Sequence, residues 1–162
     1  MPLNAAPTGE PEQPAKDLGP LAWVLDELRQ SLDAATQALR RFGRDAELVR
    51  GTDLAALDAS QLRIARQQLH QAVGALEMVG MVAPAKLLRA MEALAQRFVE
   101  DPAFCSDDAA TKMERASFAL IEFLRTALKG QNPSAVALFP QYRDVLELLA
   151  VERVHPADLW QH

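Results

Sequence analysis

His70 is the residue of this chain whose side chain is best suited to chemistry, and Gly74 follows it four residues later. A histidine imidazole is largely neutral near pH 7, so one ring nitrogen has a lone pair that can accept a phosphoryl group. Glycine has no side chain, which leaves room beside the ring for a second protein to approach. These residue types at this spacing meet the chemical requirements of a phosphoryl acceptor on the open face of a helix.

A transferring phosphoryl group is negatively charged and needs donors or cations beside it. Val73 provides neither, and we expect Arg66, one turn earlier, and Gln67 or Gln71 to substitute only in part. A missing cation in a partly exposed site costs about 1–3 kcal/mol, or about 10–100-fold in rate. The sequence therefore predicts that phosphoryl transfer through His70 is impaired.

The helix that carries His70 is expected to begin at a capping box formed by Asp58 and Gln61 and to end at Gly80. At 100° per residue, His70 falls roughly 120° from the centre of the apolar stripe of this helix, so we expect an at least partly exposed ring. That stripe comprises Leu62, Ala65, Leu69, Ala72, Leu76 and Val79. The candidate docking surface around His70 comprises Arg66, Gln67, Gln71, Val73, Gly74 and Glu77.

Apolar residues at alternating spacings of three and four predict three more long helices. They are expected over 20–43, 84–101 and 106–130, with Pro140 interrupting a shorter amphipathic piece over 136–149. Four helices with short links predict an all-α protein, an antiparallel four-helix bundle. We expect a disordered lead over 1–17, the bundle over 18–130, and a C-terminal helical extension or the start of a linker to further domains over 131–162.

The composition excludes several classes of function. The chain has 162 residues, 49% of them hydrophobic, and a net charge of −5, which disfavours nucleic acid as a partner. Cys105 is the only cysteine, so no intrachain disulfide forms, and no metal-ligand cluster is visible. A membrane-spanning run and a secretion signal are both absent from the sequence, so we expect a cytoplasmic protein.

The segment Ala65–Met81, A-R-Q-Q-L-H-Q-A-V-G-A-L-E-M-V-G-M, resembles the active helix of histidine phosphotransfer (Hpt) domains. The usual pattern in that family is histidine, two residues, lysine and glycine. The resemblance implies that His70 is the phosphoacceptor and that Gly74 is the glycine of close approach. The role of the lysine is not carried over, because Val73 stands in its place.

A wider resemblance extends over most of residues 18–160. The stretches L-G-P-L-A-W-V-L-D-E-L-R from Leu18, L-F-P-Q-Y-R-D-V-L-E-L from Leu138 and V-H-P-A-D-L-W from Val154 are similar to the N-terminal region of CheA-type hybrid histidine kinases. These kinases, of the Pil/Chp class, govern type IV pili and twitching motility. The resemblance implies a response-regulator receiver domain or a histidine kinase core as the protein partner, with ATP and magnesium belonging to the partner domains and no cofactor on this chain.

Two other functions are open at this point. One is a non-catalytic scaffold of the same fold that docks signalling proteins, and the other is a generic helical dimerisation domain. An autonomous enzyme is not expected, because the sequence has no P-loop, nucleophile elbow or kinase ATP-binding motif. Single residues also have purely structural interpretations. His70 can be an ordinary surface residue, and Gly74 can allow two helices to cross closely. Trp23 is expected to pack near the start of the first helix.

Overall fold

The protein is built from helices. The computed structural model describes residues 5–49 and 58–153, and within them the side chains of 19–49 and 58–150. It contains five α-helices, α1 (Ala5–Leu48), α2 (Ser60–Met78), α3 (Val82–Glu100), α4 (Asp107–Leu128) and α5 (Phe139–Arg153), and two 3-10 helices, η2 (Pro102–Phe104) and η3 (Ala135–Leu138). Since no strand occurs in the described parts of the chain, the predicted all-α class is confirmed.

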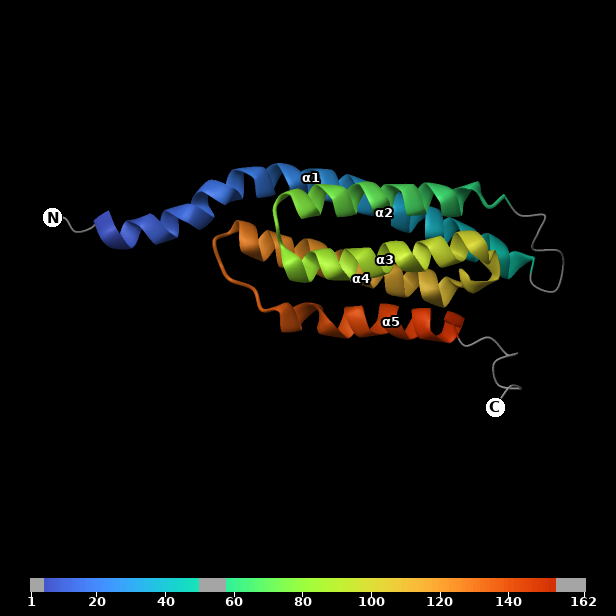
Figure 1. The fold of residues 1–162 in the computed structure, drawn as a ribbon. Helices are drawn as coiled ribbons and strands as arrows, with labels where there is room; N and C mark the ends of the chain where they lie inside the picture. Colours follow the sequence, from blue (N-terminus) through green and yellow to red (C-terminus); the bar gives the residue numbers. More distant parts are fainter. Residues whose placement is uncertain (1–4, 50–57, 154–162) are drawn as a thin grey trace.

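Helix α1 starts earlier than the sequence indicated. It begins at Ala5, whereas we expected a disordered lead up to residue 17 and a helix start near Pro20. The segment contains several good helix formers, but Pro11, Pro14 and Pro20 lie inside the helix, where a proline removes a backbone hydrogen bond, and for this reason the sequence did not predict a helix here. The first part of α1 extends beyond the other helices (Figure 1).

The long helices pack side by side around one apolar core. Helix α1 contacts α2 and α4, α2 also contacts α3, and α5 packs on α3 and α4. Figure 1 shows α5 on the far side of α3 and α4 from α1 and α2. The expected apolar stripe of α2 is buried almost completely, with only Val79 at the rim. Leu138 and Val145 belong to the same core, so the segment after residue 130 packs as part of this unit.

Several helix ends follow from single residues. The Ser106 hydroxyl accepts a hydrogen bond from the Ala109 N–H and caps α4, as predicted. Gly80 follows α2 with a φ of +69°, a conformation that suits glycine. The expected capping box at Asp58 does not form, because Asp58 bonds to the N–H of Ser60, only two residues on, in a turn before the helix.

Two expectations about the helices are corrected. Pro140 does not interrupt the last helix, because it is the second residue of α5, where a missing N–H leaves no bond unmade. Trp23 is 57% exposed on the outer face of α1, and Phe118 is 68% exposed on α4. Trp23 was expected to pack near the start of the first helix, but apolar residue type alone does not show which face another helix covers.

Helices α1 and α4 approach each other closely at Gly43. Gly43 does not end the first helix, which continues to Leu48. Gly43 is buried, and a Cβ at this position would lie 3.2 Å from the Cα of Asp107. Glycine therefore permits a close approach between α1 and the start of α4. Arg40 adds a polar tie between the same helices through Glu114 and Thr111, so it is not simply a solvated cation.

Candidate functional site

The packing of α2 determines where His70 lies. Leu69, Ala72 and Leu76 are buried against the neighbouring helices, which fixes the rotation of α2 about its axis. The His70 side chain is consequently 65% exposed. This agrees with its expected position away from the apolar stripe, and it leaves the imidazole accessible to a second protein.

Glu92 of α3 orients the imidazole. Its Oε2 lies 2.8 Å from Nδ1 of His70. A carboxylate only accepts hydrogen bonds, so this contact places the ring proton on Nδ1 and leaves the lone pair on Nε2. The Glu92 side chain is 24% exposed, which makes it the more sheltered partner of the pair. The arrangement provides an exposed nitrogen nucleophile whose second nitrogen is held by an acceptor.

Sequence reasoning missed Glu92, which lies on a different helix from the His70 segment. The inward stripe of α3, with Leu88, Met91 and Ala95 buried, leaves Glu92 at the edge of that stripe. Its position next to the apolar face was a usable signal. The register between α2 and α3, which brings Glu92 to His70 rather than to another residue, was not visible in the pattern.

Val73 does not belong to the docking surface. It is only 7% exposed and forms part of the apolar core, because α3 covers this side of α2. The inclusion of Val73 among the surface residues is therefore corrected. Gly74 differs, since a Cβ built on it would meet no atom within 4 Å apart from its local backbone. The space beside His70 is open, and no helix crossing occupies it.

The remaining predicted residues lie around the ring in different settings. Gln67, Gln71 and Glu77 are exposed on α2, whereas Arg66 is partly buried. Glu77 forms an ion pair with Arg89 of α3. We call the exposed residues of this region, together with the half-buried Glu92, the His70 surface. It comprises Gln67, His70, Gln71, Gly74 and Glu77 of α2 with Arg89 and Glu92 of α3.

Cys105 offers no competing chemistry. Its thiol is buried, and burial raises its pKa to about 12, so it is protonated at neutral pH. Its Sγ lies 3.8 Å from the carbonyl oxygen of Leu39, to which the thiol donates a weak hydrogen bond. In the described ranges, no three His, Cys, Asp or Glu side chains are grouped to hold a metal ion. Nor does any helix of the same ranges have the length and hydropathy to cross a membrane.

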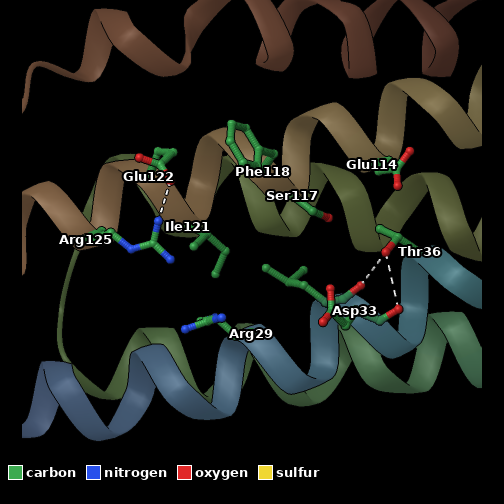
Figure 2. Close-up of a pocket in the computed structure, with 10 residues that line it drawn as sticks. Arg29, Asp33, Thr36, Glu114, Ser117, Phe118, Ile121, Glu122 and Arg125 are labelled. Atoms are coloured by element: carbon green, nitrogen blue, oxygen red, sulfur yellow. Dashed lines mark hydrogen bonds and ion pairs between the residues drawn. The ribbon is translucent and has the colours of Figure 1, made fainter.

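A second concave surface lies between α1 and α4 (Figure 2). Arg29 and Asp33 of α1 face Phe118 and Arg125 of α4 across it. The buried hydroxyl of Ser117 lines this groove without a hydrogen-bond partner among the described atoms. Its charged residues include both signs and form local pairs such as Arg125 with Glu122. No histidine or cysteine is among the described residues that line it, so the groove has no phosphoryl acceptor comparable to His70.

No protein family, curated protein or solved structure matches this chain in the comparisons with known proteins. The function of His70 is therefore inferred from the exposure of its side chain and from its contact with Glu92.

Proposed function

We propose that this chain is an Hpt-like phosphotransfer module in which His70 receives a phosphoryl group from one protein and passes it to another. The observation that carries the proposal is the exposed imidazole whose Nδ1 contacts Glu92 at 2.8 Å. This contact supports a defined tautomer with Nε2 as the nucleophile. The open space at Gly74 supports the approach of a partner protein to that nitrogen.

The proposed step is an in-line displacement at phosphorus. The Nε2 lone pair of His70 attacks the phosphorus of an aspartyl phosphate on a receiver domain, and the bond between phosphorus and the aspartate oxygen breaks. The aspartate leaves as a carboxylate with the electron pair. The imidazole becomes a positively charged phosphoimidazolium that keeps its Nδ1 proton. The Glu92 carboxylate stabilises this positive charge, and the reverse reaction returns the phosphoryl group to an aspartate.

The resemblance to Hpt domains also supports a finer description of the fold. We propose that α1 to α4 form an antiparallel four-helix bundle and that α5 is an addition on α3 and α4. The contacts of α1 with α2 and α4, and of α2 with α3, support this arrangement. The proposed partners are a receiver domain and a histidine kinase core in a cytoplasmic chemosensory system of the type IV pilus class.

Radioactive phosphoryl transfer tests the proposal. The purified protein is incubated with a phosphorylated receiver domain, or with a kinase core and labelled ATP. We expect a label that is labile in acid and stable in base, as phosphohistidine is. His70→Gln should abolish the label, whereas His155→Gln and His162→Gln are the matched controls and should retain it. A label that survives in His70→Gln contradicts the assignment.

A non-catalytic scaffold of the same fold is the second candidate. It is favoured by the burial of Val73, which leaves the His70 surface without a cation from α2 at that position. It is also favoured by exposed apolar residues such as Met78 and Val82 at the α2–α3 turn, which are typical of contact surfaces. Under this alternative, the chain binds the kinase core or receiver in a pull-down, and no label forms in conditions that label a known phosphotransfer domain.

A further inference from the structure

Two polar bridges connect α2 to α3 along the same boundary. One joins His70 to Glu92, and the other joins Glu77 to Arg89. The later residue on α2 contacts the earlier residue on α3, so these two helices run in opposite directions where the bridges form. Both pairs lie on the His70 surface.

The two bridges bracket the level of Arg89 along α2. On α2, His70 and Glu77 are seven residues apart, about 10.5 Å along the axis, whereas on α3 Arg89 and Glu92 are three residues apart, about 4.5 Å. Because the two helices run in opposite directions, a step from Glu92 back to Arg89 on α3 corresponds to a step from His70 forward to residue 73 on α2. Counted from the Glu92–His70 contact, Arg89 lies at the level of residue 73, and its own ion pair reaches Glu77, so the two contacts place Arg89 between these two levels of α2.

The charge around His70 requires such a cation. Glu92 contacts Nδ1 of His70 and Glu77 lies two turns further along α2, so both nearby carboxylates repel a phosphoryl group on Nε2. A guanidinium binds phosphoryl oxygens through two parallel hydrogen bonds, which makes arginine well suited to the task. Arg66 of α2 is partly buried, one turn before His70, whereas Arg89 of α3 is exposed and contacts Glu77 of the His70 surface.

The Arg89–Glu77 pair can exchange partners. Its side chains are 48% and 49% exposed, and ion pairs at such an exposure contribute little to stability. A phosphoryl group with two negative charges competes well with a single carboxylate for the guanidinium. We propose that Arg89 is the cation that binds the phosphoryl group on His70, and that Glu77 holds Arg89 until the phosphoryl group arrives. This inference rests on the proposed function and assigns a role in it to a residue from a second helix.

Two substitutions that break the same ion pair test the inference. Arg89→Gln removes the phosphoryl-binding cation, and Glu77→Gln releases it. Each protein is treated with phosphoramidate, a small donor from which Nε2 displaces ammonia as the phosphorus–nitrogen bond breaks. Intact mass and ³¹P NMR follow the formation and decay of phosphohistidine. We expect Arg89→Gln to reduce the rate of formation about tenfold, and Glu77→Gln to increase it.

Opposite signs separate this role from a structural one. If the pair only joined α2 to α3, both variants would change the rate in the same direction, together with the thermal unfolding midpoint. Arg125→Gln and Glu122→Gln are the matched controls, because this pair is exposed to a similar degree on α4, and neither should alter the modification of His70. The inference is overturned if Arg89→Gln reacts as the wild type does, or if Arg66→Gln shows the loss instead.

The same experiment separates the inference from the proposed function. Wild-type protein that phosphoramidate does not modify at His70 contradicts both. Wild-type protein that is modified at His70, with no difference in Arg89→Gln, overturns only the role of Arg89. A chemically formed phosphohistidine that depends on Arg89 but passes to no receiver supports the inference and contradicts the transfer function.

Discussion

Gly74→Ala is expected to make the protein more stable and less active. A glycine within a helix destabilises it by about 0.5–1 kcal/mol relative to alanine, because the glycine backbone loses more conformational freedom on folding. A Cβ on Gly74 meets nothing within 4 Å, so no steric clash offsets this gain. For a chain of this size the gain corresponds to an increase of roughly 1–4 °C in Tm.

The functional effect has the opposite sign. A methyl group at position 74 projects into the space beside the His70 imidazole, where the proposal places the partner protein. We expect phosphoryl transfer from a receiver domain to slow, and Gly74→Leu to slow it further because the side chain is larger. Reaction with phosphoramidate should change much less, since this donor is small enough to reach Nε2 past an alanine.

Differential scanning calorimetry and the transfer assay are carried out on the same preparations. Asp45→Ala is the control: Asp45 is exposed on α1, away from the His70 surface, and alanine is the better helix former. It should give a similar gain in Tm without affecting transfer. Gly74→Ala protein that is stabilised and transfers at the wild-type rate would refute the view that this glycine serves the approach of a partner.

Three further predictions concern the fold. Gly43→Ala should lower the free energy of unfolding by about 1 kcal/mol in urea titrations, because its Cβ would lie 3.2 Å from the Cα of Asp107 and 3.3 Å from the carbonyl oxygen of Ser106; an unchanged value would mean that α1 and α4 separate freely. Ser106→Ala should cost about 1 kcal/mol through loss of the bond from the Ala109 N–H, and Ser106→Thr should recover most of it. The Cys105 thiol, with its pKa raised to about 12 by burial, should react with a disulfide reagent at pH 8 only at the rate of unfolding; rapid reaction in the native protein would contradict its burial.

The sequence was informative about faces and helix ends. The spacing of apolar residues identified the buried side of α2, and so the exposure of His70, because burial of a helical stripe depends on periodicity within one helix. Ser106 and Gly80 were recognisable because a cap and a positive φ have local residue preferences. In each case the cause lies within a few residues of its effect.

Relations between helices were not predictable in the same way. The contacts of His70 with Glu92 and of Glu77 with Arg89 depend on the register of α2 against α3, which no single-helix pattern specifies. Val73 was placed on the surface because α2 was considered alone, and α3 covers it. Trp23 shows the converse case, an apolar residue to which the fold brings no neighbour that covers it.

The contribution of α3 changes the interpretation of the surface around His70. On α2 alone, Val73 in place of a cation favours a scaffold over a transfer module. The structure forms the surface around His70 from two helices, and α3 contributes both Glu92 and Arg89 to it. A cation at position 73 is then one way to provide positive charge near His70, and the role proposed for Arg89 is another. Whether the chain transfers phosphoryl groups therefore depends on the side chains of α3 as much as on the residue three places after His70.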